Sequence, residues 1–494
     1  MKLKRGFTLL LAISCITFGL HAQNEDEPEF VIEDETGDAA SSNDSGDANP
    51  ESAERDYSGE IIVTGDRRAR RRSEAVTRTE VITRQDIVKS GANSAADVLE
   101  FTPGVEIRRG IRGRSIRLQG LDPQYVLILI DGERVVGRVD NAIALTRIKS
   151  GEIERIEIVK GASSALYGSD AIGGVVNIIT RRAKGGAFGP PVEAEAEIAH
   201  GNGRRSQFGE EGTTRASGYV GLNEQFLSTG FTVGWVRSGG YDLTPFTERD
   251  RQALQLTDII PQADRDTITR KQATTGPAFT DINIGNRSVF RFTENFHVRA
   301  GGQYRFLDQT LVDAAVPRQL LDRRNQTDDG MFSVSPILYL ANDGAFRASY
   351  GFARFYDRLD VDQRQSDAFD RAEIQDERIQ EGKVQLDYEF FDDHFISLGS
   401  DFIFDELISR RISAGYGFRQ RLGLFAQDEW TVLRGANEWR VSPGVRYEAD
   451  SRFGSQTSPK FAARHGLAGL YAEPVLQRYR QPDRLYRHTE HDRQ

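Results

Sequence analysis

Arginine is concentrated in one short stretch of the sequence. Five guanidinium groups fall between residues 108 and 117, at Arg108, Arg109, Arg112, Arg114 and Arg117, and a sixth, Arg138, falls in a second expected loop at 137–141. A guanidinium group presents its N–H donors as a planar fork, which suits carboxylate, catecholate and other anionic groups. We therefore expect these six residues to bind an anionic ligand. The alternative is that several of them only pair with acidic side chains of the barrel wall that the later part of the chain is expected to form, as described below.

No set of residues has the spacing of a catalytic site. The histidines His200, His297 and His394 are scattered, and neither a G-x-S-x-G nor an H-E-x-x-H pattern occurs. The glycine-rich segment 168–174 lacks the lysine of a phosphate-binding loop. The single cysteine, Cys15, lies in a segment that we expect to be removed, which leaves no thiolate for a metal. The sequence therefore predicts binding rather than catalysis, with no metal and no cofactor.

Composition and charge exclude two further classes of protein. The mean hydropathy is -0.50, and beyond the N-terminus no run of 18 apolar residues occurs, so no membrane-spanning helix is predicted. Membrane-spanning strands stay possible, because their two faces alternate and average out polar. Residues 24–60 hold fourteen Asp or Glu against one Arg, a net charge of -13, whereas the whole chain has a net charge of -10. Nothing resembles a nucleic-acid-binding surface.

The N-terminal segments indicate export. Residues 1–22 read as a secretory signal peptide, in which Lys2, Lys4 and Arg5 precede an apolar run and Ala22 suits cleavage. Residues 23–59 are acidic and rich in Ser, Asp and Gly, and we expect them to form a disordered linker.

The stretch 151–180 is predicted to form a strand, a turn and a second strand. Ile153, Ile156 and Ile158 stand among charged residues, as in a half-buried strand, and two glycines precede an apolar strand at Val175–Ile179. This stretch resembles the end of the plug domain of TonB-dependent outer-membrane receptors. The order of the segments LxxTPGV, VLILIDGERV and IERIEIVKG is similar to that family as well. The resemblance covers an α+β domain at 66–182.

The chain beyond residue 182 alternates between apolar and polar residues in long segments. Short connections at 223–228, 293–295, 342–344, 392–393 and 434–437 take turns with long ones at 239–283, 308–330 and 362–377. Short turns at one end and long loops at the other are typical of a transmembrane barrel, whereas a soluble sandwich has no reason to separate them. About twelve strands fit into residues 183–464. The expected fold is an α+β plug domain inside a transmembrane antiparallel β-barrel.

The alternation stops near Arg464. Residues 465–494 hold Pro474 and Pro482 and show no strand pattern. Plugged transporters of the outer membrane close with 22 strands, and twelve would leave open edges in lipid. We therefore expect a frameshift or a truncated reading frame near Ala463, and an aberrant tail after it. The alternative is a polar tail after a smaller barrel.

The resemblance also assigns a role to residues 60–65. Glu60, Ile61, Ile62, Val63 and Thr64 form a β-prone segment directly after the acidic linker. In the family such a segment is the TonB box, which joins an edge strand of the periplasmic TonB protein by β-augmentation. The alternative is that these residues are only the first strand of the plug.

What the resemblance implies about function is energised uptake of a scarce ligand across the outer membrane of a Gram-negative bacterium. A ferric siderophore is the first expectation. Cobalamin, haem, a carbohydrate, or a non-functional truncated fragment are the alternatives, while a passive porin or adhesin would need neither plug nor TonB box. The expected partners are TonB with its inner-membrane energising complex, the ligand and the outer-membrane lipid, with no nucleic acid. The six arginines become candidate siderophore contacts, and Arg155 becomes the candidate contact between plug and barrel.

Overall fold

The computed structural model describes residues 61–62, 70–71, 79–110, 113–139, 142–161, 163–183, 191–201, 212–241, 248–255, 272–316, 319–341, 344–364, 371–391, 393–433 and 437–467. The predicted signal peptide, the acidic linker and the tail beyond residue 467 lie outside the described residues, as do Glu60, Val63, Thr64 and Arg112.

The first domain, residues 79–183, is called the plug below and is built on a five-stranded sheet. The strand order is β3 (Thr79–Thr83), β8 (Ile153–Lys160), β9 (Gly174–Thr180), β6 (Val126–Ile130) and β7 (Glu133–Arg134). Strand β6 runs parallel to β9, and the other pairs are antiparallel. A separate hairpin joins β4 (Val105–Gly110) to β5 (Gly113–Leu118), and the helices are α1 (Arg84–Ser90), α2 (Ala95–Leu99) and α3 (Ser164–Tyr167).

Local sequence signals fix the ends of these elements. Helix α1 starts with a capping box, in which the Thr83 hydroxyl accepts from the backbone N–H of Asp86 and the Asp86 carboxylate accepts from the backbone N–H of Thr83. It ends at Gly91, whose φ of 64° is the left-handed conformation of a helix C-cap. The turn predicted after β6 is formed by Asp131 and Gly132, with φ of 52° and 87°, as a tight hairpin requires.

The plug has its own apolar core. Ile128, Ile156, Ile158, Val176 and Ile178 of the sheet are each at most 2% exposed and belong to one cluster that also contains helix α2. Burial of one such side chain contributes about 1.5–3 kcal/mol. The predicted strands of 151–180 therefore form the centre of the plug.

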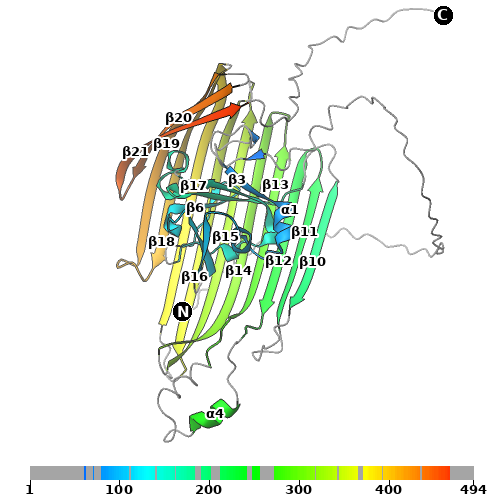
Figure 1. The fold of residues 1–494 in the computed structure, drawn as a ribbon, viewed down its shortest axis with the longest axis vertical. Coiled ribbons are helices and arrows are strands. Elements are labelled where there is room, and N and C mark those ends of the chain that lie inside the picture. The colour runs from blue at the N-terminus through cyan, green and yellow to red at the C-terminus, as the bar shows by residue number, and fades with distance from the viewer. Residues whose placement is uncertain are drawn as a thin grey trace, which may run out of the picture. The chain divides into compact units, whose positions relative to one another are not determined.

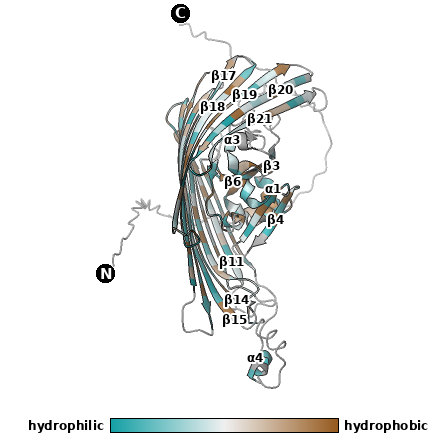
Figure 2. Cartoon of the chain, turned by 90° about the vertical axis from the view of Figure 1, so that its left-hand side faces the viewer, coloured by the Kyte–Doolittle hydropathy of each residue, from teal (hydrophilic) through white to brown (hydrophobic). Residues whose placement is uncertain are grey.

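The second domain is a twelve-stranded antiparallel sheet, called the wall below, in which each strand pairs with its neighbours in the sequence. The strands are β10 (Val192–Gly201), β11 (Thr213–Asn223), β12 (Leu227–Ser238), β13 (Ala278–Arg291), β14 (Phe296–Val316), β15 (Gln319–Tyr339), β16 (Ala345–Gln363), β17 (Arg371–Phe391), β18 (His394–Ser409), β19 (Tyr416–Leu433), β20 (Asn437–Asp450) and β21 (Gly454–Leu467). Figure 1 shows them side by side, with β10 and β21 as the edges of the described sheet. The sheet is curved, and the plug lies against its concave side (Figure 2). The predicted fold class is confirmed.

The two faces of the wall differ as the alternation predicts. Tyr304, Val384 and Tyr447 on the outward face are each more than 40% exposed. The inward face buries charged side chains instead, such as Asp281 and Arg446. An apolar outward face and a polar inward face are the pattern of a barrel wall in lipid.

The short connections are where the sequence predicts them, but two of the three long loops are wrong in large part. Strand β16 ends at Gln363 and β17 starts at Arg371, so the predicted loop 362–377 is reduced to residues 364–370. Strand β14 continues to Val316 and β15 starts at Gln319, so most of the predicted loop 308–330 is strand. The prediction failed because both faces are polar there, and polar pairs such as Arg324 with Asp308 link the strands on the outward face. The segment between β12 and β13 contains a helix, α4 (Glu248–Gln255). Strand β21 runs to Leu467, three residues past the expected end.

Among the described residues, no helix combines the length and the apolar character needed to cross a bilayer.

Candidate functional site at the interface of plug and wall

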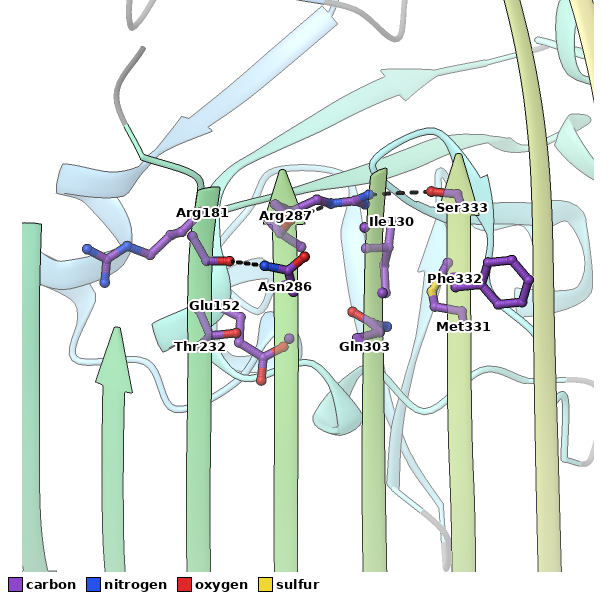
Figure 3. A pocket seen from close by; sticks show the side chains of 15 residues that line it. Ile130, Glu152, Arg181, Thr232, Asn286, Arg287, Gln303, Met331, Phe332 and Ser333 are labelled. Atoms are coloured by element: carbon purple, nitrogen blue, oxygen red, sulfur yellow. Dashed lines mark hydrogen bonds between the residues drawn. The ribbon is translucent and has the colours of Figure 1, made fainter. Parts of the chain in front are cut away.

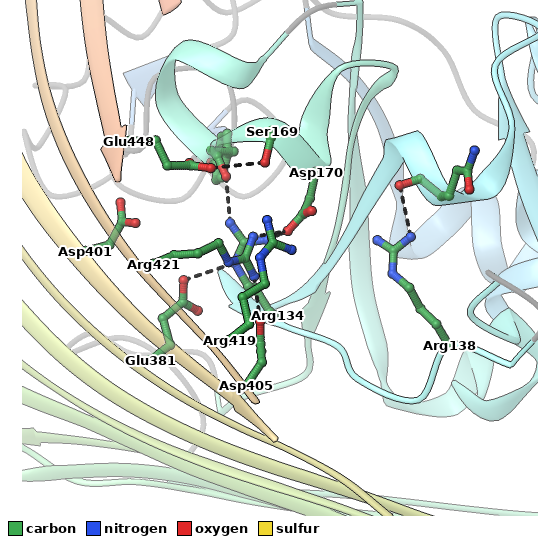
Figure 4. Close-up of polar contacts among 12 residues, drawn as sticks. Arg134, Arg138, Ser169, Asp170, Glu381, Asp401, Asp405, Arg419, Arg421 and Glu448 are labelled. Atoms are coloured by element: carbon green, nitrogen blue, oxygen red, sulfur yellow. Dashed lines mark hydrogen bonds and ion pairs between the residues drawn. The ribbon is translucent and has the colours of Figure 1, made fainter. Parts of the chain in front are cut away.

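The plug and the wall meet through charged side chains, and Arg134 of β7 lies at the centre of one group of them (Figure 4). Its Nε donates to Oε1 of Glu381 on β17 at 3.2 Å, and its Nη1 donates to Oδ2 of Asp170 at 2.8 Å. Its Nη2 donates to the carbonyl oxygen of Tyr167 at 2.6 Å. Arg134 therefore ties strand β7 both to the wall and to the plug segment 163–171.

Asp170 continues this group into the neighbouring strands of the wall. Its Oδ2 accepts from Nη1 of Arg421 on β19 at 2.6 Å, and Arg421 also contacts Asp405 of β18 at 3.0 Å. Burial alone would raise the pKa of Asp170. The guanidinium groups of Arg421 and Arg134 lower it by more than burial raises it, so the pKa is below its ordinary value. Asp170 is therefore an ionised bridge between two arginines. One residue earlier, the Ser169 hydroxyl donates to Glu448 of β20 at 3.0 Å.

Strand β17 makes further contacts to the plug around Arg134. Nζ of Lys383 donates to Oε2 of Glu133 and to the carbonyl oxygen of Gly132, both at 2.9 Å. Nearer the start of β17, Oε2 of Glu377 accepts from the backbone N–H of Gly137 at 3.0 Å. One strand therefore holds the plug over much of its length.

A second polar group joins the plug to β13 and β15. Nε of Arg287 donates to Oδ2 of Asp131 at 2.7 Å, and Lys149 lies 2.5 Å from Asp281. Nε of Arg147 lies 3.4 Å from Asp329 of β15. The interface thus combines oppositely charged pairs with apolar packing, in which Val136 of the plug joins Phe355 and Ile403 of the wall, and Phe425 of the wall joins the plug.

Glu152 is the buried acid of this second group. It accepts a hydrogen bond from the Asn283 amide, and burial raises its pKa from 4.5 to about 7, with Lys149 opposing and Asp281 reinforcing the shift. Glu152 is therefore the plug group whose charge changes near neutral pH.

Two small cavities lie between the plug and the wall. One cavity of about 20 Å³ lies between Ile130, Glu152 and the inward residues of β12 to β15 (Figure 3), and a second of the same volume lies beside Arg147. Each has room for about one water molecule. A ligand that fills several hundred Å³ would need the plug to move before it could pass these two places.

The arginines of the β4–β5 hairpin, which are predicted to bind the ligand, form ion pairs with acidic residues of the plug itself. Arg114 contacts Asp97 and lies 3.2 Å from Glu100. Arg117 and Arg108 both reach Asp122, at 3.1 Å and 3.9 Å, and Arg117 also lies 3.2 Å from Glu106. Arg109 has no described side chain, and Arg112 lies outside the described residues. Their role in ligand binding stays a prediction.

Arg138 is placed beside the same part of the plug. Its Nη1 donates to the carbonyl oxygen of Gln124 at 3.0 Å, two residues after Asp122, and burial lowers its pKa. Its own carbonyl oxygen accepts from Gln375 of β17 at 3.0 Å. The structure therefore gathers Arg108, Arg117 and Arg138 around the segment 122–126, near the end of β17 that carries the long loop.

Arg155 donates through Nε to Glu157 of its own strand at 2.8 Å. The contacts from the plug to the wall that the structure shows come from other residues, above all Arg134, Asp131, Lys149 and Asp170. Sequence reasoning missed them because their partners are more than a hundred positions away. The clustered charges of the turn 131–134, at the end of an apolar strand, were the available signal.

Two residues of the predicted TonB box form a short strand. Strand β1 (Ile61–Ile62) pairs antiparallel with β2 (Arg70–Arg71), so that Ile61 faces Arg71 and Ile62 faces Arg70 in the register. The assignment of this segment as a TonB box stays a prediction.

Two family models match the chain. The TonB-dependent receptor plug domain matches residues 71–175, and the TonB-dependent receptor-like β-barrel matches residues 203–472. The second match alone covers more than half of the chain.

Curated relatives match in their sequence over a limited length. The vitamin B12 transporter BtuB of Vibrio cholerae is 33% identical over 194 residues, which is 39% of this chain and 28% of the relative. BtuB of Vibrio vulnificus is 41% identical over 123 residues, which is 24% of this chain and 20% of the relative. The chain thus spans well under half of the relatives that it matches.

Solved structures share the fold. A mutant of the ferric enterobactin receptor PfeA from Pseudomonas aeruginosa has a TM-score of 0.59 at 18% identity, with 79% of this chain and 60% of that chain covered. The siderophore receptor PirA from Acinetobacter baumannii has a TM-score of 0.58 at 17% identity, with coverage of 79% and 59%.

Proposed function

Because this chain belongs to the TonB-dependent receptors of the outer membrane, we propose that it serves energised uptake of a scarce ligand in a Gram-negative bacterium. The observation that carries the proposal is the contact between plug and wall. It leaves cavities of only about 20 Å³ at the two places described, and beside its apolar packing it contains many charged pairs that water can replace. Such an interface blocks the path of the ligand between plug and wall at rest, and it can separate when TonB pulls on the plug.

The proposed cycle starts with ligand capture at the long-loop end of the wall, where the loop of Arg138 lies beside Gln375. TonB then pairs with residues 60–64 by β-augmentation. Because Ile61 and Ile62 already pair with Arg70 and Arg71, TonB would take the place of β2. The pull separates the polar contacts of Arg134, Asp170 and Glu133 from the wall, while the plug keeps its apolar core.

We infer a ferric siderophore as the first candidate ligand. Arg108, Arg117 and Arg138 surround one segment of the plug, and guanidinium groups suit its anionic donor groups. Cobalamin is the second candidate, because the relatives that match in sequence are named vitamin B12 transporters. The siderophore receptors share only the fold at under 20% identity.

The first test is binding of TonB to the full chain. The periplasmic domain of TonB should bind the purified chain, and deletion of residues 61–64 should abolish that binding. Deletion of residues 40–43 in the acidic segment is the matched control and should leave it unchanged. Equal binding by both deletion variants would contradict the assignment of the TonB box.

The second test is uptake by cells that lack their own receptors for these ligands and express this chain. Radiolabelled ferric siderophores and cobalamin are offered separately. The proposal predicts that one of them accumulates, that deletion of residues 61–64 stops accumulation, and that ligand still binds to these cells. Accumulation that survives the deletion would overturn the mechanism.

A further inference from the structure

The plug segment 135–139, called the strap below, lies against an apolar part of the inward face of the wall. Val136 of the strap belongs to one buried cluster with four side chains of β16, β17 and β18, namely Ala353, Phe355, Ile379 and Ile403. All five are at most 7% exposed. Their exposure to water loses the free energy that burial contributes, so this contact resists separation more than the charged pairs around it.

Gly137 lies at the closest approach between the strap and the wall. Its φ of 89° is in the left-handed region that favours glycine. A Cβ at this position would overlap the ring of Phe355 and would also meet Nη1 of Arg147. The Arg147 guanidinium group lies 4.9 Å from the centroid of the same ring, and its Nη2 donates to the carbonyl oxygen of Val136 at 2.7 Å. The strap therefore fits between Phe355 of the wall and Arg147 of the plug because residue 137 has no side chain.

Arg138 connects the strap to the candidate ligand region of the plug. The N–H of Gly137 donates to Glu377 at 3.0 Å, and the carbonyl oxygen of Arg138 accepts from Gln375 at 3.0 Å, so the backbone of both residues is bonded to β17. The Arg138 side chain bonds within the plug instead (Figure 4). It donates to carbonyl oxygens of the segment 123–126, and the shortest of these bonds is 3.0 Å. Two consecutive residues thus hold the wall and the ligand region.

We propose that the strap couples the candidate ligand region to the attachment of the plug to β16, β17 and β18. This inference rests on the proposed function, in which a ligand bound near the segment 122–126 precedes the pull of TonB. A ligand that takes the Arg138 guanidinium group away from these carbonyl oxygens displaces the residue next to Gly137. Because Gly137 fits closely between Phe355 and Arg147, a small displacement loses packing on both sides. The apolar contact is then released, and TonB has only the charged pairs to separate.

The test measures how often the strap opens, by thiol labelling of the full chain in dodecyl maltoside micelles. The variant C15S removes the single cysteine, and V136C then places one thiol in the apolar contact. Because Val136 is 4% exposed, this thiol should react with a maleimide only while the strap is open. V176C, in the fully buried centre of the plug sheet, reports unfolding of the plug instead.

G137A should raise the labelling rate of V136C about tenfold, because overpacking forces the neighbouring groups apart. It should leave the rate of V176C unchanged. The matched control is G161A, since Gly161 has a φ of 99° but a Cβ there would meet nothing within 4 Å. This control shares the backbone strain without the overlap, and it should label V136C at the rate of the unchanged protein.

A second pair of variants tests the partner of Gly137. F355A loses the packing under the strap and should raise the rate of V136C by roughly a hundredfold. F355A/G137A should label no faster than F355A, because the ring that a Cβ would overlap is gone. A further rise in the double variant would show that Gly137 acts through backbone strain and not through Phe355.

R138Q tests the coupling itself without any ligand. It removes the bonds to the segment 123–126 and should raise the rate of V136C about tenfold, the size expected for a hydrogen bond to a charged group. Four results would overturn the proposal: an unchanged rate in G137A, an equal rise in G137A and G161A, an unchanged rate in R138Q, or an equal rise at V136C and V176C. The last would mean that the plug unfolds.

Addition of ferric enterobactin or cyanocobalamin tests the proposed function separately. The ligand that binds should raise the rate of V136C in the unchanged protein and add nothing in R138Q. If neither ligand binds, the choice of ligands is wrong, whereas the rates of the unliganded variants still decide whether the strap couples Arg138 to the wall.

Discussion

The core of the plug and its contact with the wall are both buried, but the core is mainly apolar, whereas the contact adds many charged pairs to the apolar packing of Val136 and Phe425. The core packs isoleucine and valine from β6, β8 and β9 with exposures of at most 2%. The contact places Arg134, Asp170 and Arg421 in a chain of hydrogen bonds between the two domains. Burial alone therefore does not say what a region is for.

The difference indicates which part separates first. Exposure of apolar side chains to water loses the free energy that their burial contributes. Charged pairs regain hydration when they separate, so separating them costs little net free energy. A force on the plug should therefore open the polar contact with the wall before it disturbs the sheet of the plug. The following predictions compare the two regions, from the largest expected effect to the smallest.

A cavity in the core should cause the largest loss. Ile156 is fully buried and pairs with Ile82 and Ile178 in the sheet. I156A should lower the free energy of unfolding of the plug by about 2–5 kcal/mol, and I156V by about 0.5–1.5 kcal/mol. Urea unfolding monitored by amide exchange in β8 measures both. Equal effects of the two variants would show that the site does not pack as a core.

The charge of Glu152 should make the plug less stable above neutral pH. The folded pKa of about 7 exceeds the ordinary 4.5, so the folded plug binds an extra proton between these values. The contribution of Glu152 to stability is highest below pH 4.5. It falls as the pH rises, by about 3 kcal/mol once the pH exceeds 7. E152Q should remove this part of the pH dependence. An identical pH profile for E152Q would contradict the assignment of the shift to Glu152.

Loss of Arg134 should weaken the contact with the wall but not the core. In R134Q, Asp170 keeps Arg421 and Glu381 keeps Lys383, so neither acid is left without a cation. The cost should be about 1.5–3 kcal/mol, the range for a hydrogen bond to a charged group. Proteolysis of the segment 163–171 should become faster while β8 stays protected. If the segment 163–171 and strand β8 lost their protection from proteolysis equally, Arg134 would belong to the same cooperative unfolding unit as the core.

The smallest effect is expected at Arg114. Its pairs with Asp97 and Glu100 are both partly exposed, and pairs of that kind contribute about 0.2–1 kcal/mol each. R114Q should therefore change the unfolding midpoint of the plug little. Its effect on the affinity for a ferric siderophore, the first candidate ligand, then tests the ligand role separately. An unchanged affinity would remove Arg114 from the set of candidate ligand contacts.

Much of the fold could be read from the sequence, because local patterns determine it. The alternation around Ile156 and the turn at Asp131 and Gly132 predict strands β8 and β6, and the short turns set the number of strands in the wall. The extension of β14 and β15 could not be read, since polar pairs such as Arg324 with Asp308 stand where apolar alternation was the criterion.

The candidate site was less predictable than the fold. Arg134 and Glu381 are 247 positions apart, and no spacing in one sequence connects them. The arginines at 108–117 were found by their density, but that density does not reveal that Asp97 and Asp122 lie next to them. Which charges meet is decided by the tertiary fold.

Amide hydrogen exchange of the full chain in increasing urea tests the central claim most directly. The first set of amides includes that of Gly137, which bonds the plug to the wall, and that of Ser163, which bonds within the segment 163–171. The second set is the amides of β6, β8 and β9. The account predicts that the first set becomes exchangeable at lower urea while the second set stays protected. Loss of protection by both sets at one urea concentration would contradict it, because the plug would then unfold rather than detach.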